Sequence, residues 1–297
     1  MGDDAGMPAL QALIRTRGLA RASLLLLATL AIAQAGARGK DHPPPEDPLA
    51  KGPASPITDH FAFRVDYFHG SATTTGHVDD PNATAAGTPF SAENDLGLSP
   101  RDHEFRSELF FRLRSRSRLR VDLWELNREA IASPTFPIVY GGNTFQVTDR
   151  VRTRLDWRQI DLTYSYSLLR ASRYELAAGL GIHLLQTDAE ARVPERQIHE
   201  EFSGSGPFPT VDLEGTVRLW KRWSFEARAQ YLALTVSSVK GSLADYSGNL
   251  QYRLAPNFAL GLGYRSQQMK IQVSNNNPNG LLELKVNGPS LFLRASF

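Results

Sequence analysis

Apolar and polar residues alternate one by one along most of the chain after Asp59. Between Phe61 and Tyr67, aromatic residues and a valine occupy the odd positions, while the even positions carry Arg64 and Asp66. The same period of two recurs at 109–113, 119–123, 151–166, 174–184, 211–219, 223–231, 244–254, 258–264 and 291–297. This period is typical of β-strands with one apolar and one polar face. The pattern therefore predicts about ten strands, several of them longer than ten residues, against an average of about 5 to 6 in globular proteins.

Two positions depart from this regularity. In 151–166 the apolar residues are first odd, as at Leu155 and Trp157, and then even, as at Ile160 and Leu162. A change of phase by one residue is what a β-bulge produces, so we expect a bulge in this strand. Trp124 is also out of phase with its segment, which predicts that its side chain points to the polar side.

The connections between the segments predict the topology. Short turns near Ser115, Ala171, Lys221 and 255–257 alternate with long polar loops near 70–102, 131–149 and 187–206, and with shorter ones near 237–241 and 274–280. This alternation predicts an all-β fold, a closed antiparallel transmembrane β-barrel of about ten strands with short periplasmic turns and long outer loops.

Aromatic residues gather near the ends of the predicted strands, where the interfaces of a membrane attract them. One group lies on the side of the short turns: Tyr174, Trp223, Phe258 and Phe297. A second group lies nearer the long loops: Tyr67, Trp157, Tyr231, Tyr246 and Tyr264.

The amino terminus predicts export. Arginines at 15, 17 and 21 precede an apolar run over 22–33, and small residues at 33, 35 and 37 follow it. A run of this length is too short to span a bilayer, which takes about 20 residues, so residues 1–37 are predicted to be a secretory signal peptide cleaved after Ala35 or Ala37. Six prolines within 38–58 predict an extended periplasmic tether. The barrel is then 59–297.

Composition excludes several classes of protein. The formal net charge is +2, which gives no electrostatic basis for nucleic-acid binding. The absence of cysteine excludes disulfides, thiolate metal sites and a cysteine nucleophile. A mean hydropathy of −0.31 excludes a bundle of membrane helices.

On these residues, 61–297 resembles the outer-membrane β-barrels of Gram-negative bacteria. It is similar to a loose group of uncharacterised barrels that carry a segment such as 95–98, Asp-Leu-Gly-Leu, and strands such as 179–183 and 261–265. The end of the chain looks like the carboxy-terminal strand that barrel-assembly machinery recognises, through Leu291, Leu293, Ala295 and Phe297. The resemblance implies outer-membrane lipid, lipopolysaccharide and that machinery as partners. It implies no activity, and it leaves the oligomeric state open.

The polar face of the strands predicts the lining of the lumen. Its candidates are Arg106, Glu108, Arg112, Arg120, Asp122, Arg152, Arg154, Asp156, Arg158, Glu175, His183, Asp212, Glu214, Arg218, Glu226, Arg228, Arg253, Arg265 and Arg294. A barrel of about ten strands has a narrow lumen, because open channels belong to about 16 to 18 strands. We therefore expect these charges to pair across the interior and plug it. The alternative is a narrow ion or solute path whose selectivity is set by the excess of arginine.

Small inward residues at 177–181 and 259–263 are expected to leave room for long arginine side chains, or else to open a small cavity. His183, beyond the first of these runs, is expected to be a hydrogen-bonded filler. A hydrolase of the His-x-Ser type needs a serine where this chain has Leu185.

Among the loop residues, His77 with Asp79 and Asp80, Asp102 with His103, and His199 with Glu200 and Glu201 match no protease spacing, although such acids can bind divalent cations. We therefore predict a non-enzymatic barrel without cofactor or metal. A barrel hydrolase acting on lipid or peptide, and a soluble periplasmic β carrier, are the alternatives.

Overall fold

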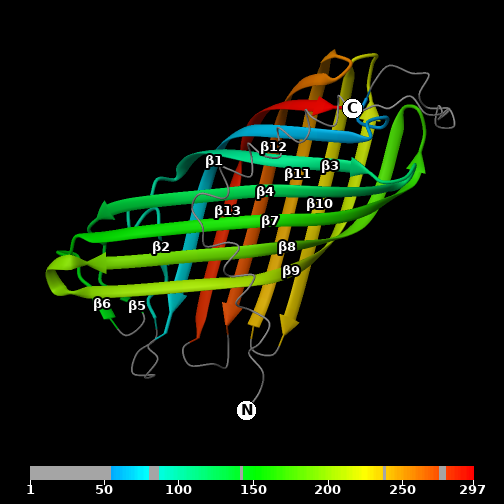
Figure 1. Ribbon diagram of the computed structural model, residues 1–297. Coiled ribbons are helices and arrows are strands. Elements are labelled where there is room, and N and C mark those ends of the chain that lie inside the picture. Colours follow the sequence, from blue (N-terminus) through cyan, green and yellow to red (C-terminus); the bar gives the residue numbers. More distant parts are fainter. Residues whose placement is uncertain (1–54, 80–86, 141–142, 237–238, 274–278) are drawn as a thin grey trace, which may run out of the picture. The chain divides into compact units, whose positions relative to one another are not determined.

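The alternating segments form long antiparallel strands (Figure 1). The computed structural model describes residues 55–79, 87–140, 143–236, 239–273 and 279–297. The long strands are β1 (Phe61–Val78), β3 (Arg101–Arg112), β4 (Ser117–Ala132), β7 (Val151–Arg170), β8 (Tyr174–Val193), β9 (Ile198–Arg218), β10 (Trp223–Val236), β11 (Val239–Ala255), β12 (Phe258–Val273) and β13 (Gly280–Ser296). Shorter elements are β2 (Phe90–Ser91), β5 (Ile138–Tyr140), β6 (Asn143–Phe145) and the 3₁₀ turn η1 (Pro194–Arg196). Within the described residues, no helix is long and apolar enough to cross a membrane.

Each long strand pairs with the next one along the chain, and β13 pairs back with β1. This last register runs from Ala62 opposite Ser296 to Val78 opposite Gly280, so the sheet is closed. The predicted fold class, a closed antiparallel barrel of ten strands with short turns at one end, is confirmed. The predicted signal peptide and most of the predicted tether lie outside the described residues.

The strands extend further toward the long loops than the sequence predicts. β8 runs to Val193 and β9 begins at Ile198, so the bounds predicted for the loop at 187–206 are wrong. β11 begins at Val239, so part of the loop predicted at 237–241 is also strand. At about 3.3 Å per residue and a tilt of about 40°, the 21 residues of β9 rise about 50 Å along the axis. The apolar band of outer-membrane barrels is about 25 Å tall, so half of this strand projects beyond a membrane.

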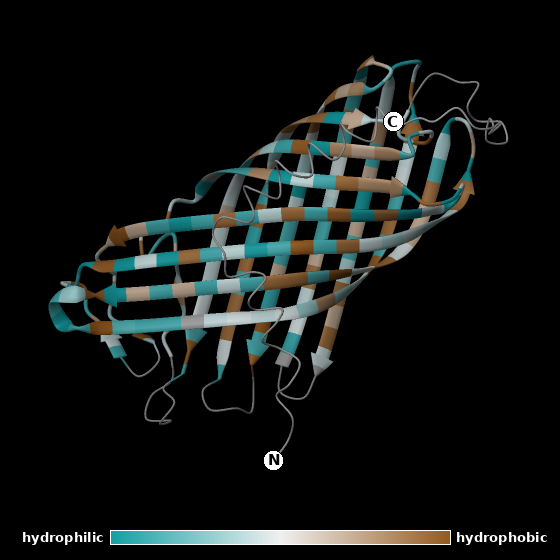
Figure 2. Cartoon of the chain, in the orientation of Figure 1, coloured by the Kyte–Doolittle hydropathy of each residue, from teal (hydrophilic) through white to brown (hydrophobic). Residues whose placement is uncertain are grey.

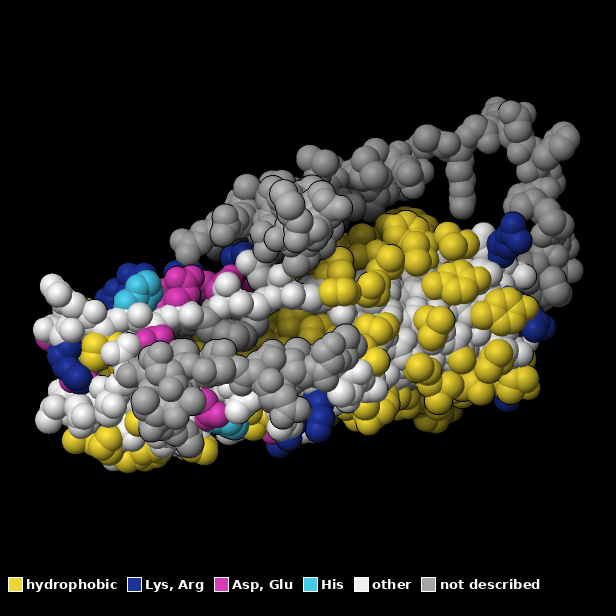
Figure 3. All heavy atoms as spheres, turned by 90° about the horizontal axis from the view of Figure 1, so that it is seen from below, with side chains coloured by type: hydrophobic (Ala, Val, Ile, Leu, Met, Phe, Trp, Pro, Cys, Tyr) yellow, Lys and Arg dark blue, Asp and Glu magenta, His cyan; other side chains and the backbone are white. Residues whose placement is uncertain are grey.

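An apolar band surrounds the half of the barrel that carries the short turns. Figure 3 shows hydrophobic side chains gathered on the right, the end that bears the carboxy terminus in Figure 1, and charged side chains over the other end. Leu180, Leu213 and Leu262 are among the exposed residues of this band. Tyr174, Trp223, Phe258 and Phe297 are exposed at its lower edge, and Tyr67, Tyr231, Tyr246 and Tyr264 at its upper edge. The band makes this half the transmembrane part.

Along β7, the polar and apolar faces are exchanged where the apolar band ends. Its odd residues face inward along the whole strand, from Val151 through Trp157 to Asp161 and Ser167. The register with β4 and β8 is unbroken across 152–166, so the bulge predicted from the change of phase is wrong. The irregularity lies instead between Ser167 and Leu169. What changes is the polarity of the two faces: the strand is apolar outside at membrane level, as at Leu162, and apolar inside beyond it, as at Trp157. Figure 2 shows hydrophobic and hydrophilic residues alternating along the strands.

The same inversion occurs on other strands. On β4, Trp124 and Leu126 point inward and are buried, which confirms the prediction for Trp124. Phe68 on β1 and Leu185 on β8 are also buried inside. Trp157 is only 1% exposed, so its predicted place in the outer aromatic girdle is wrong.

Beyond the membrane half, the wall divides into two sheets. β3 pairs with β1 only as far as Ser71, and with β4 only as far as Trp124. Among the described residues, the register between β9 and β10 ends at Val211 opposite Tyr231. One sheet is then β4-β7-β8-β9 and the other is β10-β11-β12-β13-β1, and the two groups run in different directions in Figure 1. The apolar inner faces pack between these sheets, as in a β-sandwich.

Candidate functional site

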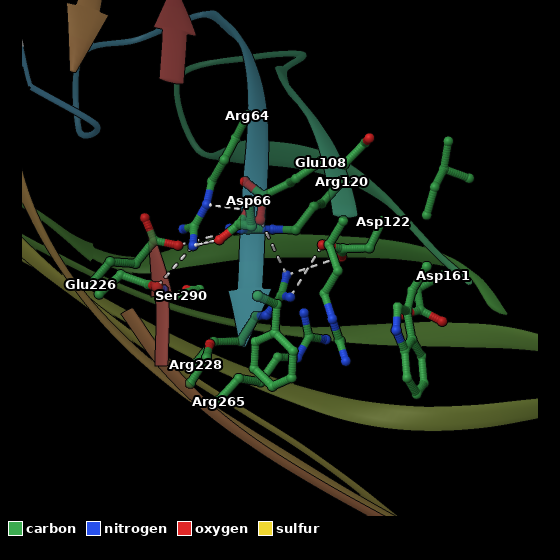
Figure 4. A pocket seen from close by; sticks show the side chains of 17 residues that line it. Arg64, Asp66, Glu108, Arg120, Asp122, Asp161, Glu226, Arg228, Arg265 and Ser290 are labelled. Carbon is green, nitrogen blue, oxygen red and sulfur yellow. Dashed lines mark hydrogen bonds and ion pairs between the residues drawn. The ribbon is translucent and has the colours of Figure 1, made fainter. Parts of the chain in front are cut away.

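The lumen at membrane level is filled by charged side chains from facing strands. Figure 4 shows Arg64 and Asp66 of β1 pointing toward Glu108 of β3 and Arg120 of β4. The Arg120 guanidinium lies 2.7 Å from Glu108 and donates to it. All four side chains are buried. Sequence analysis had assigned Glu108 and Arg120 to this lining but had not included the pair on β1.

Glu214 on β9 joins two arginines of the opposite wall. Its Oε2 accepts hydrogen bonds from Arg118 and Arg120, each at 2.8 Å. Nearer the short turns, Glu175 accepts two bonds from Arg112, at 2.8 and 2.9 Å. Bonds of this charge-assisted kind are the strong ones inside a protein. They join β3, β4, β8 and β9 across the lumen.

The remaining charges complete this network. Arg228 on β10 donates to both carboxylate oxygens of Asp122, at 3.1 and 3.3 Å. Glu226 lies 3.3 Å from Arg120 and 4.0 Å from Arg294. Asp212 is fully buried on β9 beside Glu214. The charged network consists of Arg64, Asp66, Arg106, Glu108, Arg112, Arg118, Arg120, Asp122, Glu175, Asp212, Glu214, Glu226, Arg228 and Arg294.

The periplasmic end is closed by the residues that precede β1. Ser55, Ile57 and Asp59 are buried in the mouth of the barrel. Asp59 accepts from Arg253 at 2.8 Å and from Arg294 at 3.5 Å. The last part of the predicted tether is therefore packed into the barrel. Arg112, Arg170 and Arg218 also donate to this segment, at Asp59, Ile57 and Ser55 respectively.

A thin polar layer lies on the outer side of the charged network. His183 is 0% exposed, and its Nδ1 lies 2.7 Å from Asp161 and 2.9 Å from Gln159. Gln267 donates to Gln159 at 2.9 Å. Arg106 marks the end of this layer, because its guanidinium lies 4.1 Å from the ring centre of Trp124. The polar contacts of His183 are thus made through Nδ1, and its buried Nε2 has no hydrogen-bond partner.

An apolar layer crosses the lumen beyond these groups. We call it the apolar layer; it consists of Phe68, Ala72, Trp124, Leu126, Trp157, Leu185, Leu243, Met269, Leu284 and Val286. Its members come from both sheets, and every one of them is buried. The lumen is therefore crossed first by paired charges and then by apolar side chains.

Four predicted lumen residues lie elsewhere. Arg152, Arg154, Asp156 and Arg158 occupy even positions of β7 and face outward beyond the membrane half. The Arg152 side chain is 58% exposed, and Arg154 forms a 2.6 Å ion pair with Asp156 on the surface. Because both faces of β7 exchange polarity, the charged face in this stretch is the outer one, and the assignment to the lumen is corrected.

Several inward charges were absent from the predicted lining. Arg64, Asp66 and Arg118 share the phase of predicted neighbours, so the alternation itself contained the signal. Asp245 is bound to Arg265, which donates to it at 2.9 Å. The role of Asp59 had no signal in the sequence, because it depends on a segment outside the alternating strands.

Gly261 makes room for an aromatic ring. A side chain at Gly261 would collide with the ring of Phe292 on the neighbouring strand. The Arg64 guanidinium stacks on that ring at 3.6 Å from its centre. The glycine thus permits a cation–π contact in the wall of the charged network.

A second space lies between the two sheets at the outer end. We call it the outer pocket, and its volume is about 120 Å³. Its lining residues include Val78, Phe90, Leu96, Leu98, Ile138, Phe145, Val151, Leu155, Ala189, Ala191, Ile271 and Leu282. The alternation of residues did not indicate this pocket, because its walls come from both strand ends and loops.

The segment 95–98, which carried the family resemblance, forms part of this wall. Leu96 and Leu98 are buried in it, and Gly97 between them has φ +72°, a conformation that glycine adopts without strain. Asp95 accepts a hydrogen bond from the backbone of Ser91 at 2.7 Å. The conformation of Gly97 therefore directs both leucine side chains toward the pocket.

Arg128 fixes this loop to the barrel. Its guanidinium lies 2.7 Å from Glu93 and donates to Thr74 at 3.0 Å and to the backbone of Ser99. Glu93 in turn accepts from the backbone of Thr74 at 2.8 Å. A buried arginine with partners on β1 and in the loop holds the pocket wall in place.

Polar groups lie at the edge of the outer pocket. They include Tyr140, Glu190 and Glu200. Burial, together with the negative charge of Glu200, raises the pKa of Tyr140 to about 12. The Tyr140 hydroxyl therefore stays protonated at neutral pH and can donate a hydrogen bond.

The histidines of the predicted loop clusters lie beside acidic or aromatic residues. His199 lies 3.6 Å from Glu190, and His69, His103 and Tyr67 contact one another on the outer surface. Among the described residues, no group of three or more His, Asp or Glu side chains is arranged to hold a metal ion. Asp80 lies outside the described residues, and the side chain of Asp102 is not described.

An apolar band of membrane height around a closed sheet, with a charged interior, decides the architecture. The chain has the fold of an outer-membrane β-barrel. No family model matches it, and no curated protein matches its sequence.

Among solved structures, the chain is similar to the outer membrane protease OmpT from Escherichia coli, at 13% identity and a TM-score of 0.48, over 80% of this chain and 97% of that one. It is also similar to Neisserial surface protein A, at 14% identity and a TM-score of 0.32 over 80% and 97%. A third is OprG from Pseudomonas aeruginosa, at 8% identity and a TM-score of 0.33 over 80% and 96%. Proteolysis is a property of the first of these proteins.

Proposed function

We propose that this protein is a non-conducting, non-enzymatic barrel of the outer membrane of a Gram-negative bacterium, exported by its signal peptide. Its membrane half is a rigid plugged base, and its outer half presents a folded surface for contacts with envelope lipid, lipopolysaccharide or a ligand. The observation that carries this proposal is the succession of two barriers in one lumen. The charged network fills the membrane half, and the apolar layer follows directly.

Each barrier opposes ions for a different reason. In the charged network, both carboxylate oxygens of Asp212 lack a hydrogen-bond partner. The arginines and the other carboxylates form ion pairs with one another, so an ion must break these pairs to pass. In the apolar layer, an ion loses its hydration without any compensating partner. A narrow solute path along the arginines, the alternative expected from the sequence, would require both barriers to open together.

Planar bilayer recordings test this proposal. Folded protein, identified by its heat-modifiable migration, is expected to give no stepwise conductance and no solute efflux from proteoliposomes. Reproducible unitary steps from the folded form would overturn the plug. The same migration assay on the membrane fraction tests the location, since a soluble β carrier would be released by urea and show no shift on boiling.

The absence of catalysis rests on the surroundings of His183. This histidine is sealed between the charged network and the apolar layer, where a lipid or peptide substrate has no access. A hydrolase remains testable: if hydrolytic activity toward lipid or peptide is found, alanine at His183 or at the exposed His103 should leave it unchanged. Loss of that activity in the His183 variant would contradict the proposal.

The exposure of residues at the end of the chain supports the proposal that barrel-assembly machinery is a partner. Leu291, Leu293 and Phe297 face outward on β13, where a recognition machine can reach them before the strand joins β1. Phe297→Ala is expected to lower the amount of heat-modifiable barrel in the membrane. Ser296→Ala is the control, because Ser296 points inward. Equal yields of the two variants would count against this signal.

A further inference from the structure

We propose that the outer pocket is a binding site for one small, uncharged lipophilic molecule, such as a hydrocarbon or a medium-chain alcohol. This inference goes beyond the proposed function, because a plugged barrel needs no ligand. It rests on the shape of the pocket, on the chemistry of its walls and on the charges at its edge.

The pocket lies inside the outer half of the barrel. Ile271 and Leu282, which pack against the apolar layer, line it, and the β5–β6 hairpin and the loop of 90–98 form part of its walls. Its volume of about 120 Å³ is close to that of an apolar cavity of about 150 Å³ that binds benzene. A protein gains stability by filling apolar space of this kind, and here two loops are built around the space instead of into it.

The walls lack polar partners for a hydrophilic ligand. Phe90, Leu98 and Phe145 are typical of the lining, which is overwhelmingly apolar. A sugar or a peptide would lose its hydrogen bonds to water here and find few replacements. A lipophilic molecule would instead release the water that now contacts these walls.

The charges at the edge of the pocket decide between a neutral and an anionic lipophile. Glu190 and Glu200 both line it. The arginine that also lines it, Arg154, is bound to Asp156 at 2.6 Å. Glu190 is paired with Arg192 and lies 3.6 Å from His199. The Glu200 carboxylate, which accepts a hydrogen bond from Asn143, is therefore the group that repels a carboxylate or sulfate headgroup. The protonated hydroxyl of Tyr140 is available to an alcohol, so the pocket favours a neutral head.

The loop anchor gives the site a defined shape. Arg128 binds Glu93, Thr74 and Ser99, and the left-handed Gly97 directs Leu96 and Leu98 into the wall. A wall fixed in this way binds at a lower cost in ordering than a mobile loop would. The segment that marks the family resemblance thus acquires a role in the ligand site.

The experiment uses the full-length barrel in lipid nanodiscs, with the uncharged fluorophore 1-aminoanthracene as the probe. We expect saturable binding above the partition into protein-free nanodiscs. Ala189→Phe fills the pocket from its inner wall and should weaken binding at least about tenfold. Ala233→Phe adds the same ring on an exposed position of β10 and should leave binding unchanged. If Ala189→Phe does not give a heat-modifiable barrel, Ala191→Phe replaces it.

Competition with two molecules of equal chain length tests the charge argument. In the wild type, 1-decanol should displace the probe at pH 8, and decanoate should do so much more weakly. Glu200→Gln should strengthen displacement by decanoate and leave that by decanol unchanged. Equal competition by both in the wild type would overturn the assignment to uncharged ligands. Absence of saturable binding, or binding that survives Ala189→Phe, would overturn the site itself while leaving the conductance result untouched.

Discussion

Each long strand has a membrane half and an outer half, and the polarity of its inner and outer faces is exchanged between them. In the membrane half, the outer face contacts lipid and is apolar, and the inner face carries Arg120 and Glu214. In the outer half, the outer face contacts water and carries Arg152 and Arg154, and the inner face holds Trp157. The backbone continues through the boundary without a break in register. The period of two therefore identifies a strand. The phase of the alternation shows which face of that strand is polar.

The stabilising interactions of the two halves differ accordingly. Lipid covers the apolar outer face of the membrane half. The interior of this half can therefore be polar, provided that its charges are paired. The outer half has no lipid, and it must bury apolar surface between two sheets as a soluble domain does. Substitutions of one chemical kind should therefore have different effects in the two halves.

The largest effect is expected from Glu214→Ala in the membrane half. It leaves Arg118 and Arg120 buried without their shared carboxylate, and removal of one partner from a buried pair costs up to about 5 kcal/mol. Urea unfolding in lipid vesicles measures this loss. The control is Glu129→Ala, which removes an exposed partner of Arg152 in the outer half and should cost less than about 1 kcal/mol. Equal losses would show that the lumenal charges are not the main support of the base.

The apolar layer is the counterpart in the outer half. Trp157→Ala should cost about 3 to 5 kcal/mol, because the ring is buried among apolar neighbours and leaves a cavity. Trp157→Phe retains most of the contacts and should recover much of the loss. Unfolding followed by the fluorescence of the remaining tryptophans gives the comparison. A loss below about 1 kcal/mol in the alanine variant would mean that the outer half does not depend on this core.

Charge on the outer face should separate the two halves along one strand. Leu262→Arg places a cation in the apolar band of β12, which costs about 2 to 4 kcal/mol near the middle of a bilayer. Gln268→Arg lies on the same face of the same strand beyond the band, beside Glu283, and should be tolerated. The fraction of heat-modifiable barrel in vesicles measures both. A tolerated Leu262→Arg would place the membrane boundary elsewhere.

The smallest effect concerns the pH dependence of the outer half. Burial raises the pKa of Tyr140 from its ordinary value of about 10 to about 12, so the folded state favours the neutral phenol. Its contribution to stability is therefore fully present below pH 10 and is lost as the pH rises through 12. Ultraviolet absorbance titration of the wild type and of Tyr140→Phe isolates this group. A difference spectrum that titrates near pH 10 would contradict the burial.

The sequence sufficed for the barrel because lipid imposes a simple rule on strands of the membrane half. Outward apolar and inward charged positions identified all ten strands, and Trp124 was correctly turned inward. Beyond the membrane this rule reverses, which led to a false bulge at Trp157 and to four arginine and aspartate positions assigned to the wrong face. The phase of the alternation alone cannot distinguish a β-bulge from an exchange of the polar and apolar faces at the edge of the membrane.

The outer part of β9 escaped prediction for a local reason. Residues 203–209 are rich in Gly, Ser and Pro, which is typical of a loop. Pro207 and Pro209 are nevertheless paired with β8. The register with β10 ends at Val211, so these prolines sit where the sheet has an edge and a missing donor is tolerated. The outer pocket was likewise out of reach, because it depends on how distant loops meet.

The closure at Asp59 has a consequence for the kinetics of folding. Asp59 accepts from Arg294, 235 positions later in the chain, and the neighbouring β1–β13 seam joins equally distant segments. Contacts of such sequence separation require the ordering of nearly the whole chain before they can form, and they slow folding. The seam and the Asp59 contacts should therefore appear together as the last and slowest phase. Until then, the two terminal strands remain open edges with unpaired backbone groups, where another strand can add.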